Sequence, residues 1–304
     1  MAPTLARLRP ARLPIGRSIE PAGIRGYYID FRSKNASAAW PPEWFPWPGF
    51  HRFMGVAQWG LGAFERYLLG EGEAWLAAST AAARYVVEQQ ERSGSLRGGW
   101  LEPRGHRHTF TTPAPWLSAM AQGQCASLLV RVGRETGDDE LLESAASGLR
   151  PMVVQVDAGG VAARLDGGLF LEEYPTDPPS LVLNGAIFAL WGAFDVARAL
   201  GNDLGTRIFA EAGDTLAANL DRWDTGFWSR YDLYPHRLVN VASPFYHALH
   251  IEQLDAMNRI APAPAYAALA ARFRGQAASM PNRARALVQK AAFRLVVRKG
   301  LRAA

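Results

Sequence analysis

Acidic and phenolic side chains stand next to one another at one point of this chain, directly before a rigid turn. Glu172, Glu173 and Tyr174 are consecutive, and three prolines follow within the next five positions. Each proline fixes its own φ angle and restricts the residue before it, so the backbone that presents these groups is stiff. We interpret the segment as a rigid loop that positions groups for acid–base chemistry. The alternative is that Glu172 and Glu173 are solvated loop carboxylates before a helix start.

Phenols and imidazoles recur in two later segments where loops meet helices. Tyr231 lies in the first segment, and Tyr246, His247 and His250 lie in the second. A tyrosine exchanges protons near neutral pH only if cationic neighbours lower its pKa from about 10. Arg237 and the two histidines are candidates for that task. The alternative is that the phenols are half-buried aromatics and the histidines lie on a helix surface.

Side chains suited to contact a sugar occur in two further places. The proline-stiffened segment 40–52 crowds several aromatic rings, Trp47 among them, on which sugar rings can stack. A hydrophobic plug at one end of the fold is the equal alternative. Gln122 and Gln124 lie near a predicted helix start, where they could bind a polar ligand or join helices. No phosphate-binding glycine loop, nucleophile elbow or dinucleotide fingerprint is present.

Composition bounds the class of protein. The chain has 304 residues, 49% of them hydrophobic, enough for a sizeable core. A single cysteine, Cys125, excludes an intrachain disulfide and is expected to be buried. Without Cys-rich, His-x-x-x-His or calcium-loop patterns, we expect no metal site. No apolar run reaches about 18 residues and Met1–Arg25 lacks an apolar signal region, which favours a cytoplasmic protein.

Charge is concentrated near the C-terminus. The formal net charge is +5, but residues 282–304 contain seven basic residues and no acid, so the rest of the chain is mildly acidic. The basic residues fall roughly on one helical face and apolar residues on another. This pattern permits peripheral contact with anionic lipid on the inner face of a membrane, or a terminal helix packed on the body. A polyanionic substrate is a further option, and we expect no nucleic acid partner.

The period of the apolar residues predicts a mainly α protein. The predicted helices span 52–69, 73–92, 113–136, 139–155, 181–200, 204–222, 243–259, 264–279 and 283–298. The motifs 137–139 and 201–203 combine a glycine stop with an aspartate as the next cap, so the helices form antiparallel hairpins. Such hairpins would close into an (α/α) barrel or toroid. Ser180 or Asp177 could cap the helix over 181–200.

Long connections separate the helical pairs and are rich in glycine, proline and aromatic residues. They are expected to hold short strands, including a small hairpin over 154–168. Long loops at repeated positions predict one functional face with a central cleft. No linker divides the chain, which we describe as a basic segment (1–26), a helical domain (27–280) and a basic helix (281–304).

Five motifs, in this order, resemble the C-terminal helical domain of D-glucuronyl C5-epimerases. They are Met120-Ala-Gln-Gly-Gln124, Glu172-Glu-Tyr-Pro-Thr176, Leu181-Val-Leu-Asn-Gly185, Tyr231-Asp-Leu233 and Tyr246-His-x-x-His250-Ile-x-Gln-Leu254. The resemblance covers about residues 27–278. It implies an (α/α) barrel that converts glucuronate to iduronate within an anionic polysaccharide such as heparosan, without an added cofactor. It also leaves a homodimer open.

The resemblance implies roles for individual residues. Glu173 and Tyr246 would be the opposed acid–base pair, Tyr174 and Tyr231 would donate to the substrate carboxylate or relay protons, and Asn184 would bind the substrate. The candidate substrate-binding residues are Asn184, Gln122, Gln124, Arg237, His247, His250 and Trp47.

Two departures from the family pattern bear on the substrate. Tyr234 stands where the family places an arginine that helps to bind the uronate carboxylate, and Arg237 or His236 could substitute for it. Only a short Arg/Pro segment precedes the helical domain, whereas animal members carry β-rich domains there. Glucuronate polymers other than heparosan therefore fit as well. The alternatives are a polysaccharide lyase or glycoside hydrolase of the same barrel class, or a non-catalytic glycan-binding protein.

Overall fold

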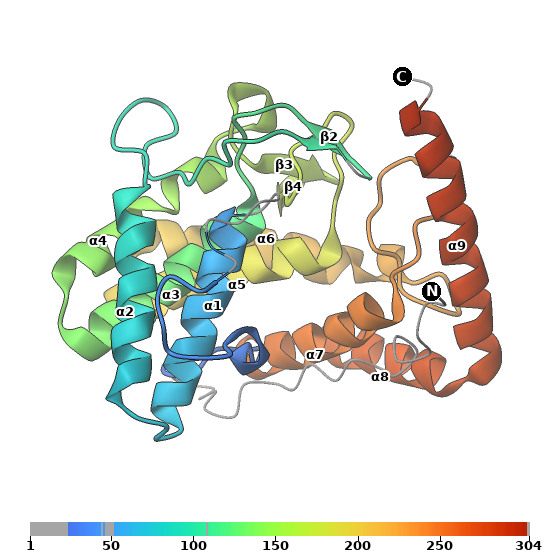
Figure 1. The fold of residues 1–304 in the computed structure, drawn as a ribbon. Helices are drawn as coiled ribbons and strands as arrows, with labels where there is room; N and C mark the ends of the chain where they lie inside the picture. Colours follow the sequence, from blue (N-terminus) through green and yellow to red (C-terminus); the bar gives the residue numbers. More distant parts are fainter. Residues whose placement is uncertain (1–23, 44, 46–51, 108, 303–304) are drawn as a thin grey trace.

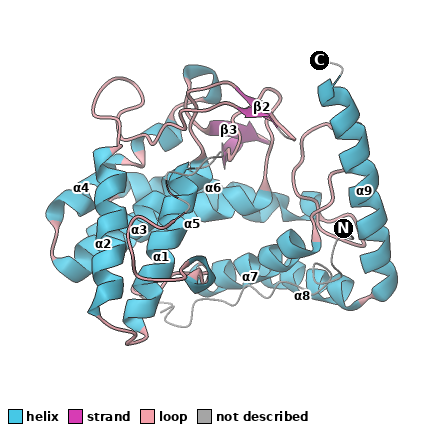
Figure 2. Cartoon of the chain, viewed as in Figure 1, coloured by secondary structure: helices cyan, strands magenta, loops and turns pink. Residues whose placement is uncertain are grey.

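A computed structural model of the chain describes residues 24–43, 45, 52–107 and 109–302. Trp47 therefore lies outside the described residues. The described part is mainly helical, with four short strands (Figure 2). The helices are α1 (Arg52–Leu68), α2 (Glu73–Glu88), α3 (Ala119–Thr136), α4 (Asp139–Ser147), α5 (Leu183–Leu200), α6 (Asp203–Asn219), α7 (Pro244–Ile260), α8 (Pro264–Ala278) and α9 (Met280–Arg302).

The helices pack as successive pairs. Contacts join α1 to α2, α3 to α4, α5 to α6 and α7 to α8, and the first helices of the pairs touch in the order α1, α3, α5, α7 (Figure 1). The predicted mainly α fold of helical hairpins is confirmed, whereas closure into a complete barrel stays a prediction. Helix α9 follows α8 and stands at one edge of the molecule in Figure 1.

Local sequence signals set most helix ends. Gly137 and Gly201 end α3 and α5 in the left-handed conformation, with φ of 70° and 61°, as their positions predict. Helix α4 ends at Ser147 and not at 155: Gly148 is its C-cap, and the chain continues as a short 3₁₀-helix, Arg150–Val153, that has Pro151 in its first turn. Helix α3 begins at Ala119 and not at 113, after Ser118, whose hydroxyl accepts a hydrogen bond from the Ala121 amide.

Two hairpins of short strands lie in the connections between helical pairs. Strands β1 (His106–Arg107) and β2 (Thr111–Thr112) pair antiparallel, and so do β3 (Ala162–Leu165) and β4 (Gly168–Leu171). The hairpin predicted over 154–168 therefore lies further along the chain. The reason is the turn at Asp166 and Gly167, whose positive φ angles of 50° and 84° suit a tight hairpin connection.

The centre of the fold is the contact between α3 and α5. A side chain at Gly192 would place its Cβ 2.4 Å from the Cα of Gly123, so the two helix backbones meet directly. Beside this crossing, Arg131 and Asp195 form a fully buried ion pair. Cys125 is buried, as predicted. Within the described ranges, no helix is long and apolar enough to cross a membrane.

Candidate active site

The loop before α5 is held by the carboxylate of Glu172. Its two oxygens accept hydrogen bonds from the backbone amides of Ser180 and Leu181, at 2.8 and 2.9 Å, and from the Ser180 hydroxyl. Leu181 has a φ of 52°, a strained conformation for a leucine. Ser180 thus does not cap α5, which was one of our two predictions. The N-cap is Val182, and Glu172 fixes the turn that leads into the helix.

The neighbouring carboxyl group of Glu173 has a different environment. Glu173 is 3% exposed, and its Oε2 accepts a hydrogen bond from the Asn184 side-chain amide at 3.5 Å. Its side chain packs against Gly185, where an added Cβ would lie 2.4 Å from Oε2 of Glu173. The carboxyl group of Glu173 therefore fits only because residue 185 lacks a side chain. It is buried without the backbone donors that hold Glu172.

Burial changes the acidity of Glu173. Desolvation raises its pKa to about 8, the charge of Glu172 adds to the rise, and a hydrogen bond with Tyr174 opposes it. A carboxyl group with this pKa takes up and releases protons near neutral pH, as a general acid or base must.

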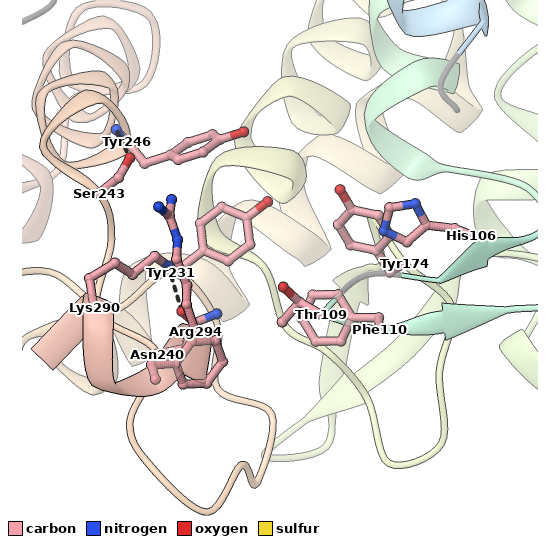
Figure 3. Close-up of a pocket in the computed structure, with 11 residues that line it drawn as sticks. His106, Thr109, Phe110, Tyr174, Tyr231, Asn240, Ser243, Tyr246, Lys290 and Arg294 are labelled. Atoms are coloured by element: carbon pink, nitrogen blue, oxygen red, sulfur yellow. Dashed lines mark hydrogen bonds between the residues drawn. The ribbon is translucent and has the colours of Figure 1, made fainter. Parts of the chain in front are cut away.

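Three tyrosine side chains converge next to Glu173. Figure 3 shows Tyr231 and Tyr246 pointing from one side toward Tyr174 on the other. The rings of Tyr231 and Tyr246 lie 4.9 Å apart in an edge-to-face arrangement. Hydrogen bonds that affect their pKa values link Glu173 to Tyr174, Tyr174 to Tyr231, and Tyr231 to Tyr246. The four groups form one connected cluster.

The tyrosines are weak acids in this environment. Desolvation, followed by the charge of Glu173, raises the pKa of Tyr246 to about 12, while a hydrogen bond with Tyr231 opposes the rise. The same two causes raise the pKa of Tyr174 and Tyr231 well above 10. The expectation that cations lower these pKa values is therefore wrong. The phenols hold their protons at neutral pH, donate hydrogen bonds, and can give up a proton only to a strongly basic acceptor such as a carbanion.

Two cavities open onto this cluster, and we refer to them together as the cleft. The first, the carboxyl cavity, has a volume of about 410 Å³, within the range of small-molecule sites. Its polar lining residues are Ser33, Lys34, Gln58, Glu173, Tyr174, Asn184 and Tyr246. The buried side-chain oxygen of Asn184, Oδ1, has no hydrogen-bond partner among the described residues, which suits it to a ligand.

The second, the cation cavity, lies on the other side of the tyrosines. It shares Tyr174 and Tyr246 with the carboxyl cavity. Its polar lining residues are His106, Thr109, Tyr174, Tyr231, Asn240, Ser243, Tyr246, Lys290 and Arg294. The described residues contain no group of three or more His, Cys, Asp or Glu side chains that could hold a metal ion.

Several predicted substrate-binding residues lie away from the cleft. Gln122 accepts a hydrogen bond from the Trp100 amide and donates one to the carbonyl oxygen of Gly148, so it ties α3 to a loop and to the end of α4 and has a structural role. Gln124 is buried and accepts a hydrogen bond from Gln58, which does line the carboxyl cavity. Arg237 is exposed and lines neither cavity.

The two histidines of α7 are buried and do not lie on a helix surface. His247 contacts Ser229 and the carbonyl oxygen of Phe273, and its ring stacks on Trp228 at 3.7 Å. His250 contacts the same Ser229 hydroxyl. Burial lowers the pKa of His247 to about 4 and that of His250 well below 6.5, so both are neutral. They pack α7 onto its neighbours.

Several residues that line the cleft lie outside the five sequence motifs and were not predicted. His106, in β1, stacks on Tyr174 with ring centroids 4.9 Å apart. Lys34 and Gln58 line the carboxyl cavity, and Lys290 and Arg294 of α9 line the cation cavity. The cluster of basic residues near the C-terminus was the one signal that pointed to a polyanion. Tyr234, at the position of the expected arginine, packs on Phe110 instead.

Comparison with known sequences places this fold and site in a family. Residues 97–275 match the family described as "D-glucuronyl C5-epimerase C-terminus". The match covers more than half of the chain, and the chain belongs to this family. The matched region contains Glu173, Asn184, Tyr231 and Tyr246, whereas α9 lies beyond it.

Two relatives illustrate the extent of the similarity. The D-glucuronyl C5-epimerase of Caenorhabditis elegans is 33% identical over 189 residues, which are 56% of this chain and 30% of that protein. An uncharacterized protein of Methanocaldococcus jannaschii is 28% identical over 143 residues, 46% of this chain and 45% of that protein. The chain thus spans less than half the length of either relative.

Proposed function

We propose that this chain is a uronyl C5-epimerase that converts D-glucuronate residues within a polysaccharide to L-iduronate. The observation that carries the proposal is the pairing of the buried Glu173 carboxyl group with the Tyr246 phenol on one cavity. One group is suited to take a proton and the other to give one. The name of the worm relative supports the same reaction class.

The reaction needs both of these groups. The hydrogen on C5 is α to the uronate carboxylate, so breaking the C5–H bond leaves its electron pair delocalised into that carboxylate. The dianion must be stabilised by donors aimed at its oxygens. Inversion then requires a proton from the opposite face of the ring. The chemistry needs a base, an acid and charge-stabilising donors, and it consumes no co-reactant.

The residues of the cleft divide these tasks. In the direction from glucuronate to iduronate, ionised Glu173 accepts the proton from C5, and Tyr246 donates its own proton to the other face. The phenolate of Tyr246 is then protonated again through the hydrogen-bonded tyrosines or from solvent. In the reverse direction the two groups exchange roles. The side-chain amide of Asn184 donates to Glu173, and its side-chain oxygen Oδ1 is offered to a sugar hydroxyl.

Deuterium exchange tests the proposal. Heparosan or another glucuronate polymer is incubated with the protein in deuterated water, and C5 deuterium and iduronate are measured by NMR. We expect both to accumulate with the polymer length unchanged. Absence of C5 deuterium in every glucuronate polymer offered would contradict the proposal. An unsaturated uronate with shortened chains would show a lyase instead.

A further inference from the structure

Helix α9 brings two cationic side chains to the tyrosine cluster. Lys290 and Arg294 are one helical turn apart and both line the cation cavity, together with Tyr231 and Tyr246 (Figure 3). The helix lies beyond the region that matches the family, which ends at residue 275. These two charges are therefore a feature of this chain that the family match does not cover.

Lys290 is held in a defined position. Its Nζ donates a 2.6 Å hydrogen bond to the side-chain oxygen of Asn240 and lies 5.5 Å from the centre of the Tyr231 ring. Asn240 in turn donates to the buried carboxylate of Asp232. The order Asp232, Asn240, Lys290 aims the ammonium group at the cavity without forming a direct ion pair. The partner of Lys290 is a neutral amide, so its charge is not neutralised by contact.

The cation cavity has an excess of positive charge. Among the residues that the structure describes, neither Lys290 nor Arg294 forms an ion pair with a carboxylate, and none of the residues that line this cavity is acidic. Burial and the charge of Arg294 lower the pKa of Lys290 to about 8. An ammonium group in this setting is stabilised by an anion that enters the cavity.

We infer that Lys290 and Arg294 bind the carboxylate of the uronate whose C5 hydrogen is exchanged, and so supply the charge that Tyr234 does not. This inference rests on the proposed function. The carboxylate is the one anionic group that a glucuronate must present next to Tyr231 and Tyr246. Both cations are placed to stabilise the second negative charge that forms there during proton transfer.

The test measures binding separately from turnover. Affinity for a heparosan oligosaccharide is determined for the wild-type chain and for Lys290→Met, Arg294→Met and Arg285→Met. Arg285 is the matched control, because it lies on α9, stacks on Phe227 and lines neither cavity. We expect Lys290→Met and Arg294→Met each to weaken binding by about tenfold or more and Arg285→Met by less than about twofold.

A carboxyl-reduced oligosaccharide isolates the interacting group. It carries glucose in place of glucuronate, so the Lys290→Met substitution should leave its affinity unchanged. Lys290→Arg should retain binding of the charged oligosaccharide. Equal weakening by all three methionine variants, equal sensitivity of both oligosaccharides, or no binding by the wild-type chain would overturn the inference. Binding that follows the expected pattern without any C5 deuterium would support this anion site and contradict the epimerase.

Discussion

The two sides of the cleft are built from different groups and in different environments. On one side, Glu173 in the loop before α5 and Asn184 in α5 are buried, close to the contact between α3 and α5. On the other side, Lys290 and Arg294 project from α9, where Lys290 is half-buried and Arg294 is exposed. In the proposed reaction, proton transfer requires a carboxyl group taken out of water, whereas capture of a polyanion requires charges that the polymer can reach. The fold meets these demands by placing them on separate elements.

The comparison predicts that substitutions on the two sides change different kinetic constants. The largest effect is expected for Glu173→Gln, which keeps the size of the side chain and removes its proton-accepting function. C5 deuterium exchange should fall by about 10³-fold with little change in affinity for the oligosaccharide. A variant that keeps its exchange rate but binds the polymer weakly would show that Glu173 belongs to the binding side.

Glu172→Gln is the matched control for this substitution. Because the pKa of Glu173 rises from 4.5 to about 8 on folding, its presence lowers the free energy of unfolding progressively between these pH values. Glu173→Gln should therefore stabilise the protein at pH 8, by on the order of a few kcal/mol, but not at pH 4. Glu172→Gln should destabilise it at pH 4 by about 1–3 kcal/mol, since it replaces one of the two acceptors for Ser180 and Leu181 with an amide donor. The loss should be smaller at pH 8, because burial also raises the pKa of Glu172, to about 7. Thermal unfolding at both pH values measures the difference.

Tyr246→Phe is expected to have the next largest effect, because it removes the proton donor on the opposite face. Formation of iduronate should fall by about 10²-fold. Glu173 can still remove and return a proton, so deuterium should continue to enter glucuronate without inversion. Tyr266→Phe is the control, since Tyr266 is a buried tyrosine of α8 outside the cleft. Loss of exchange and inversion in equal measure would contradict the separate roles of the two faces.

The pH dependence of the reaction should contain one limb from each side of the cleft. Glu173 must be ionised to accept a proton, so kcat/KM should fall about tenfold per pH unit well below its pKa of about 8. Lys290 must be protonated to bind a carboxylate, so binding should weaken as the pH rises above its pKa of about 8. Lys290→Arg should remove the alkaline limb and leave the acid limb in place, because an arginine stays charged.

The smallest effect on catalysis is expected on the outer face of α9. Val288 and Leu295 are 71% and 64% exposed and point away from the cleft-lining Lys290 and Arg294. Val288→Asp and Leu295→Asp should leave C5 exchange within about twofold of the wild-type rate. They should also reduce flotation with anionic vesicles if the lipid contact predicted from the sequence exists. Unchanged flotation would contradict the predicted lipid contact and would not change the assignment of the cleft.

Much of the fold follows from the sequence because periodic apolar residues and glycine stops act locally. The helix starts at Arg52, Asp139 and Asp203 lie within one residue of their predicted positions. The sequence predicts the hairpin over 154–168, whereas its strands span 162–171. The valines near residue 154 suit a strand and a short 3₁₀-helix equally well, and the structure has 3₁₀-helices there. The register depended on which turn residues could adopt positive φ angles.

The site was predictable where its residues share one loop or motif. Glu173, Tyr174 and Asn184 meet, and Tyr231 and Tyr246 join them, as the motifs indicate. Buried polar residues such as Gln122 and His247 could not be told from ligand contacts, because their partners are backbone groups distant in sequence. The position of Lys290 in the cleft could not be predicted from the sequence around it. Its function depends on where α9 docks, which is a property of the folded molecule.

The contact between Gly185 and Glu173 has a consequence for how this site can change over time. Any side chain at position 185 would compete with the carboxyl group for the same space. A substitution at Gly185 therefore also displaces the carboxyl group of Glu173. Position 185 cannot vary during evolution while Glu173 keeps its place. The cation side has no such restriction, since Lys290 and Arg294 project from a helix beyond the shared domain. Under the proposed function, substrate preference can thus diversify through α9 while the proton-transfer chemistry remains fixed.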